Sequence, residues 1–133
     1  MNVSVIIPNW NGRSLLEKNL PSIAAAFEKK ENKNTEVIIV DDASSDDSVS
    51  FVRENFPKFK VIQHRVNRGF SSSINTGVRS AKGKLVVLLN SDVSVTFNFL
   101  VPVGRHFENK KTFGVSLNEQ NFGWAQGNFE SGF

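Results

Sequence analysis

The sequence contains no cysteine, which excludes disulfide bonds and metal centres with thiolate ligands. No apolar stretch approaches the length of about 20 residues that a membrane-spanning helix needs. The first residues, Met1–Ser4, lack the basic segment that begins a secretory signal peptide. We therefore expect a cytoplasmic protein, associated at most peripherally with the inner face of a membrane.

Two glycine-rich phosphate-binding motifs are missing as well. The absence of Gly-x-Gly-x-x-Gly disfavours a dinucleotide-dependent dehydrogenase, and the absence of Gly-Lys-Ser or Gly-Lys-Thr excludes a P-loop. The formal net charge is +3, and the lysines are scattered rather than gathered in a stripe with aromatic residues. We therefore expect no nucleic-acid partner.

What the sequence does contain is a regular alternation of apolar runs and helical segments. With 133 residues, 39% of them hydrophobic, it has the size and apolar content of one globular domain. Runs without polar alternation are typical of strands covered on both faces of a parallel sheet. Four strands are expected, at Val3–Ile7, Glu36–Val40, Lys60–His64 and Lys84–Leu89.

Helices are expected between these strands. Ser14 and Glu17 have the spacing of a capping box, and Pro21 predicts a kink or a split in the helix that follows. Pro8 should end the first strand because proline lacks a backbone donor. Strands and helices in this order predict an α/β fold, a three-layer, doubly wound, mainly parallel sheet. The expected helices are Ser14–Lys30, Asp46–Phe56, with Asp46 and Asp47 as capping residues, and Gly69–Ser80.

Beyond Val93 the pattern weakens. Phe97–Phe107 suits a helix interrupted by Pro102, and Phe113–Leu117 suits a strand. The last residues, 121–133, combine aromatic residues with Gly and Asn, and chains seldom end on exposed Phe without a partner surface. We interpret this end as a cut through a larger domain.

Polar residues follow each expected strand, at the sheet edge where ligands bind in open α/β folds. Trp10 offers a flat face for stacking on a base, or it plugs the end of the sheet. Asp42 can accept a hydrogen bond from a base or a ribose. The adjacent carboxylates of Asp41 and Asp42 repel each other unless a ligand or neighbouring amides donate to them.

The third and fourth strand ends supply further polar groups. The segment from Asn67 to Phe70 opens a helix, a natural place for anionic oxygens, although a simple loop and cap would need the same residues. Asp92, with Asn90 and Ser91, offers one firm carboxylate, and hard cations share such ligands with substrate phosphates. The combined set suits a nucleotide diphosphate that carries another group.

Four segments at the strand ends form one ordered set: Val3–Gly12, Val40–Asp46, Asn67–Phe70 with Asn75-Thr76-Gly77, and Leu88–Asp92. Together they resemble the family 2 glycosyltransferases with the GT-A fold, over about residues 3–93. The resemblance implies inverting transfer of a sugar from a nucleotide-diphosphate donor to a glycan or lipid-linked acceptor, with Mn²⁺ or Mg²⁺ bridging the diphosphate.

By this resemblance, Trp10 stacks on the base, Asp42 binds the base, and Asp92 is the last acid of an Asp-x-Asp motif that holds the metal. Asn90 replaces the first acid of that motif, which leaves Asp92 as the main protein ligand. The donor-binding residues are then expected to be Pro8, Asn9, Trp10, Asn11, Asp41, Asp42, Asn67, Gly69, Phe70, Asn75, Asn90, Ser91 and Asp92.

The resemblance also implies a catalytic carboxylate beyond the metal motif, in an acidic pair before a helix. Only Glu108, Glu119 and Glu130 follow, and none has that setting. We therefore assign no catalytic residue and expect residues 1–133 to form one nucleotide-sugar-binding domain, with a core at 1–93 and an incomplete acceptor-side region at 94–133. Two alternatives stay open, a non-catalytic nucleotide- or sugar-binding module and a nucleotidyltransferase, although the latter expects a glycine-rich loop after the first strand.

Overall fold

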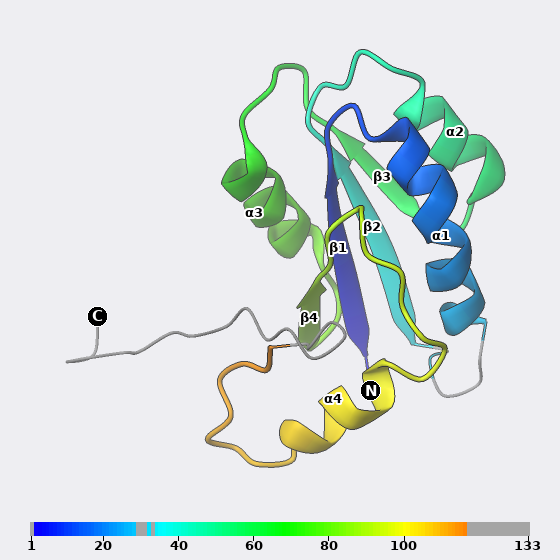
Figure 1. Ribbon diagram of the computed structural model, residues 1–133. Coiled ribbons are helices and arrows are strands. Elements are labelled where there is room, and N and C mark those ends of the chain that lie inside the picture. The colour runs from blue at the N-terminus through cyan, green and yellow to red at the C-terminus, as the bar shows by residue number, and fades with distance from the viewer. Residues whose placement is uncertain (1, 29–31, 33, 117–133) are drawn as a thin grey trace. The chain divides into compact units, whose positions relative to one another are not determined.

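The computed structural model describes residues 2–28, 32 and 34–116. Contacts group the chain into two compact units, of which the first runs from Met1 to Phe99 and the second begins at Leu100. The first unit is a four-stranded parallel sheet with α3 on one face and α1 and α2 on the other (Figure 1). Its elements are β1 (Val3–Asn9), α1 (Arg13–Phe27), β2 (Thr35–Asp41), α2 (Ser48–Asn55), β3 (Lys60–Gln63), α3 (Phe70–Ser80) and β4 (Leu85–Leu88).

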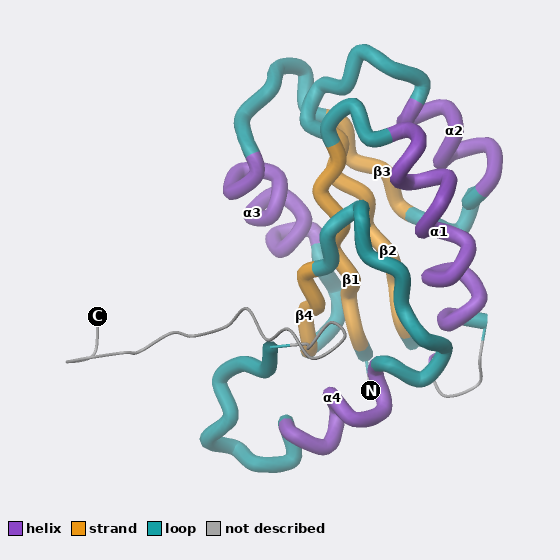
Figure 2. Tube along the Cα trace, viewed as in Figure 1, coloured by secondary structure: helices purple, strands orange, loops and turns teal. Residues whose placement is uncertain are grey.

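The strand order is β3-β2-β1-β4, and every pairing is parallel. Ile6 of β1 is opposite both Ile38 of β2 and Leu88 of β4. The chain therefore builds outward from β1 in one direction through β2 and β3, and then places β4 on the other side of β1 (Figure 2). This reversal creates a switch point beside β1, the place where open α/β sheets bind ligands. The expected three-layer α/β architecture is confirmed.

Alternation along the strands divides the core between the two faces of the sheet. Ile6, Ile38 and Val40 are fully buried on the face that carries α3. Helix α3 approaches this face so closely that a Cβ at Gly77 would lie 2.3 Å from Ile6 Cγ2. On the other face, α1 buries Leu16, Leu20 and Ile23. Both faces of the sheet are therefore covered, as the continuous apolar runs predict.

Pro8 does not end β1, contrary to the expectation from the sequence. The strand continues to Asn9, whose carbonyl accepts from the amide of Asp42 at 2.8 Å. Successive residues of a parallel strand direct their backbone groups to opposite neighbours, so Pro8 faces β4 rather than β2. The strand β4 ends at Leu88, so it offers no strand carbonyl to a backbone N–H at position 8. The N–H that Pro8 lacks therefore removes no hydrogen bond from the sheet.

The capping box and the split at Pro21 are also wrong expectations for the first helix, whereas the alternative, a kink at Pro21, stays a prediction. Helix α1 begins at Arg13 with Gly12 as its N-cap, and no side chain caps it, so Ser14 and Glu17 form no capping box. Glu17 instead binds Arg13 across one turn, with Nη1 and Oε2 2.9 Å apart. Pro21 lies inside one continuous helix rather than splitting it. Its exposed position lets water reach the carbonyl that loses a helical donor.

The second unit contains α4 (Leu100–His106), which includes Pro102 and is shorter than the predicted helix. Residues 113–116 form no strand, and the rest of the predicted strand and the aromatic tail at 121–133 lie outside the described residues. Among the residues that the structure describes, no helix is both long and apolar enough to cross a membrane. The assignment of residues 1–133 to a single nucleotide-sugar-binding domain stays a prediction.

Candidate functional site

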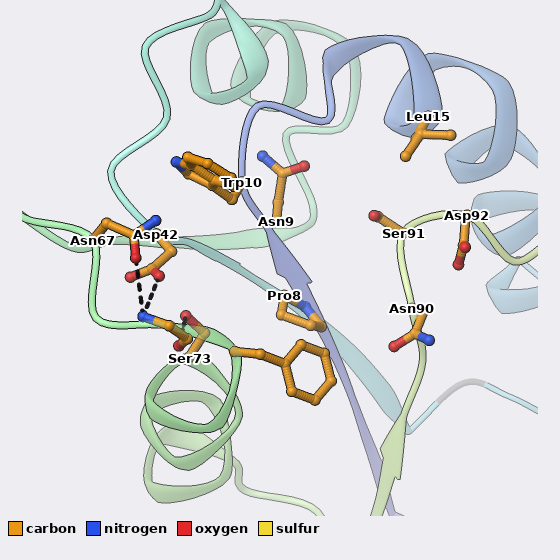
Figure 3. A pocket seen from close by; sticks show the side chains of 12 residues that line it. Pro8, Asn9, Trp10, Leu15, Asp42, Asn67, Ser73, Asn90, Ser91 and Asp92 are labelled. Carbon is orange, nitrogen blue, oxygen red and sulfur yellow. Dashed lines mark hydrogen bonds between the residues drawn. The ribbon is translucent and has the colours of Figure 1, made fainter.

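A pocket of about 770 Å³ lies at the carboxyl edge of the sheet, within the range of ligand-binding cavities. It draws on all four strand ends and on the first turns of α1 and α3. Figure 3 shows Trp10, Asp42 and Asn67 on one side of it and Asn90, Ser91 and Asp92 on the other. The lining residues are Pro8, Asn9, Trp10, Leu15, Asp42, Asn67, Gly69, Phe70, Ser73, Asn90, Ser91 and Asp92.

Most of the residues expected from the sequence meet in this pocket, but Asn11, Asp41 and Asn75 do not line it. Their roles as binding residues stay predictions. The pocket also includes Leu15 and Ser73, which the sequence did not single out as donor-binding residues. Leu15 lies in the first turn of α1 and Ser73 in the first turn of α3, so both reach the pocket from the helices that follow β1 and β3.

Asp41 joins the ends of β1 and β2. Its side chain is fully buried and accepts from the Ser44 hydroxyl at 2.6 Å, from the Ser44 amide at 3.0 Å and from Asn9 Nδ2 at 2.9 Å. Hydrogen bonds from these donors offset the electrostatic repulsion between the adjacent carboxylates of Asp41 and Asp42. Asp41 therefore shapes the edge of the sheet without reaching the pocket.

Asp42 anchors the loop between β3 and α3. Its carboxylate accepts from His64 Nδ1 at 2.7 Å, from the amide of Arg68 at 2.9 Å and from the amide of Gly69 at 2.7 Å. The other ring nitrogen of His64 lies 2.9 Å from Thr76 Oγ1, which links the anchor to α3. Because a carboxylate has about four acceptor positions, protein donors leave one of them for a ligand.

The ionisation of Asp42 follows from these contacts. Burial raises the pKa of its carboxyl, whereas hydrogen bonds from His64 and from the amides of Arg68 and Gly69 lower it, and the net pKa lies below the ordinary value. The side chain is therefore a firm anion, although only 4% of the residue is exposed.

The loops after β1 and β2 are also bonded to each other. Asn11 Oδ1 accepts from the amide of Ser45 at 2.8 Å, and the amide of Asn11 donates to the Ser44 hydroxyl at 2.8 Å. Asn11 and Ala43 both adopt left-handed backbone angles, with φ of 49° and 60°. Asn tolerates this region, whereas Ala does so at some cost. These contacts hold Trp10 on a fixed turn.

Of the two acids expected to cap α2, Asp47 is the N-cap residue, but its side chain makes no capping hydrogen bond. The Oδ1 of Asp46, one residue earlier, accepts from the amide of Ser48 at 3.0 Å. Asp46 also accepts from the amide of Arg13 at 3.1 Å, so it ties the starts of α1 and α2 together. Burial raises the pKa of Asp46, but the bonds from Ser48 and Arg13 outweigh it and lower the pKa overall.

The aromatic side chains of the pocket are open to solvent. Trp10 and Phe70 are each 62% exposed. An exposed aromatic ring at a pocket that also holds carboxylates is an available stacking surface rather than part of the core. The proposal that Trp10 merely plugs the end of the sheet is therefore disfavoured.

The Asn90–Asp92 segment forms a turn in which the amide of Val93 donates to the carbonyl of Asn90 at 3.3 Å. Within the described part of the chain, no hydrogen bond or ion pair engages the Asp92 carboxylate. No group of three His, Asp or Glu side chains among the described residues is suited to hold a metal. One free carboxylate with an amide and a hydroxyl as neighbours therefore suits a hard cation that is shared with a diphosphate.

A family model described as "Glycosyl transferase family 2" matches residues 4–128. The chain belongs to this family. Among the curated relatives of this family 2 chain is a dolichol-phosphate mannosyltransferase of Pyrococcus furiosus, 35% identical over 95 residues, which are 70% of the chain and 26% of the relative. An uncharacterised glycosyltransferase of Haemophilus influenzae is 32% identical over 90 residues, 68% of the chain and 29% of the relative. The family 2 chain thus spans less than a third of either protein.

Solved structures give the same picture. S. aureus TarS in complex with UDP-GlcNAc matches with a TM-score of 0.71 at 27% identity, over 81% of the family 2 chain and 31% of TarS. The mannosyltransferase PcManGT from Pyrobaculum calidifontis, in complex with GDP-Man and Mn²⁺, matches with a TM-score of 0.66 at 30% identity, over 74% of the chain and 30% of PcManGT. The GT-A fold implied by the sequence motifs is confirmed.

Proposed function

We propose that the protein transfers a sugar from a nucleotide-diphosphate donor to an acceptor hydroxyl with inversion, and that this chain supplies the donor-binding half. The observation that carries the proposal is the meeting of an exposed Trp10, an anchored Asp42 and a free Asp92 in one pocket. The UDP-GlcNAc and GDP-Man bound in the related structures support a ligand of this class.

Each of these residues then has a distinct role. Trp10 stacks on the base, and Asp42 accepts from it through its remaining acceptor position. Asp92, helped by Asn90 and Ser91, holds Mn²⁺ or Mg²⁺, which supplies positive charge for the departing diphosphate when it is bound. Gly69 and Phe70, at the start of α3, line the pocket beside the donor.

The acceptor side of the reaction is a separate part of the proposal. We assign no described residue as the base that removes the acceptor proton, and we expect no sugar transfer by this chain alone. The names of several relatives, dolichol-phosphate and undecaprenyl-phosphate transferases, favour a lipid-linked acceptor. The protein would then work on the cytoplasmic face of a membrane, bound peripherally.

Thermal shift and calorimetry with UDP-GlcNAc and GDP-Man, each with and without Mn²⁺, test the donor site. One donor at 100 times its Kd should stabilise the chain by about 2.7 kcal/mol, and Mn²⁺ should tighten its binding. Trp10→Ala should weaken binding by about 1–3 kcal/mol, because it removes the stacking face. Phe97→Ala is the matched control, since Phe97 is 64% exposed and does not line the pocket. Equal binding by wild type and Trp10→Ala, or no binding of either donor, would contradict the proposal.

A further inference from the structure

Helix α1 is bonded to the loop that carries Asp92, at positions on both sides of that residue. Asn19, in the middle of α1, donates from Nδ2 to the carbonyl of Ser91 at 3.0 Å. Its Oδ1 accepts from the hydroxyl of Ser94 at 2.6 Å. One side chain therefore spans the loop from the residue before Asp92 to the second residue after it.

A second contact extends this connection by one turn of the helix. The Ser22 hydroxyl accepts from the amide of Val95 at 3.2 Å and donates to the carbonyl of Asn19 at 2.8 Å. The loop is thus fixed on both sides of Asp92, whereas the Asp92 carboxylate has no hydrogen-bond or ion-pair partner within the described residues. A metal-ligating residue whose backbone is fixed and whose carboxylate oxygens have no partner is positioned to bind a cation.

Packing alone does not account for an amide at this place. Asn19 is 2% exposed and shares the buried face of α1 with Leu16, Leu20 and Ile23. An apolar side chain would suit this face better, because a buried amide is costly unless its groups are hydrogen-bonded. Both groups of Asn19 are bonded, and both bonds go to the Asp92 loop.

We propose that Asn19 is a positioning residue for the metal-binding carboxylate: by holding Ser91 and Ser94 it fixes the direction in which Asp92 enters the pocket. This inference rests on the proposed function, because it assumes that Asp92 holds the metal. Groups that orient a metal ligand commonly change metal affinity by about 10- to 100-fold when they are removed. Asn19→Ala should therefore weaken Mn²⁺ binding in the presence of saturating nucleotide by about that factor.

The experiment measures two affinities on the same chain, with UDP and GDP as probes. Calorimetry without metal gives the Kd of the nucleotide, and the electron paramagnetic resonance signal of free Mn²⁺ gives the Kd of the metal at saturating nucleotide. The variants are Asn19→Ala and the milder Ser94→Ala, which removes one bond at an exposed residue and should cost about two- to tenfold. Lys18→Ala, an exposed neighbour on α1, is the matched control and should keep both wild-type affinities.

A loss of Mn²⁺ affinity in both variants, with the metal-free nucleotide Kd unchanged, supports the positioning role. Unchanged Mn²⁺ affinity in the variants, while wild type binds Mn²⁺ together with the nucleotide, overturns this inference and leaves the proposed function standing. A parallel fall in both affinities also overturns it, because it would indicate a general structural defect. Absence of Mn²⁺ binding in wild type overturns the metal role of Asp92 and this inference with it.

Discussion

Asp42 and Asp92 each follow the carboxyl end of a strand of the same sheet and line the same pocket, yet their surroundings are opposite. Asp42 is 4% exposed and accepts three hydrogen bonds from the protein, while Asp92 is exposed and accepts none from the described residues. A carboxylate whose acceptor positions are mostly filled builds the pocket, and one whose positions are free can bind a ligand. Two acids at similar positions in the sequence therefore have different roles.

Replacing each acid in turn should distinguish these roles most clearly through the change in the free energy of unfolding. Asp42→Ala leaves His64 and the amides of Arg68 and Gly69 without their buried acceptor, so we expect a loss of about 3 kcal/mol in the free energy of unfolding. Asp92→Ala removes an exposed side chain without described partners and should change that free energy by less than about 0.5 kcal/mol. Urea denaturation of both variants measures the difference. Similar losses in the two variants would break the contrast between the acids.

When metal binding is measured instead of stability, Asp92 should be the acid whose replacement has the large effect. Asp92→Ala removes the free carboxylate, and we expect the Mn²⁺-dependent part of nucleotide affinity to fall by about 100-fold or more, beyond the effect of losing an orienting group. The metal-free affinity for UDP or GDP should stay at its wild-type value. Calorimetry with and without Mn²⁺ makes the measurement, and Glu54→Ala, an exposed acid outside the pocket, is the control. Metal-dependent binding that survives Asp92→Ala would refute the assignment.

The sheet and its functional edge were predictable because their signals are local. Continuous apolar runs such as Val37–Val40 indicate burial on both faces, and polar residues at the ends of parallel strands must meet at one edge. Local signals failed where a neighbouring element decides the outcome. Pro8 stays in its strand only because β4 stops short of it, and no pattern around Pro8 carries that information.

The division of work between the acids was not predictable, because it depends on distant partners. The donors to Asp42 lie 22 to 27 residues further along the chain, and two of them are backbone amides that any residue would supply. His64 offered one signal, a titratable residue at the end of an expected strand. Asn19 offered another, a polar residue among the apolar positions of α1. Such a residue on a buried face is a reason to look for a loop that it binds.

Acid titration gives the finest test of the contrast, because it follows the ionised form of Asp42 without removing its bulk. The pKa of Asp42 in the folded chain lies below the ordinary 3.8, since hydrogen bonds to the carboxylate outweigh burial. Its contribution to stability is therefore complete above that value and is lost as the pH falls through the lower, folded pKa. Asp42→Asn should flatten the fall in unfolding free energy below about pH 4 relative to wild type. Asp46 also has a lowered pKa, but it is present in both proteins, so urea denaturation of wild type and Asp42→Asn between about pH 5 and pH 2.5 isolates Asp42 by difference. Identical slopes in wild type and Asp42→Asn would mean that the hydrogen bonds to Asp42 do not favour its ionised form, and the contrast with Asp92 would then rest on exposure alone.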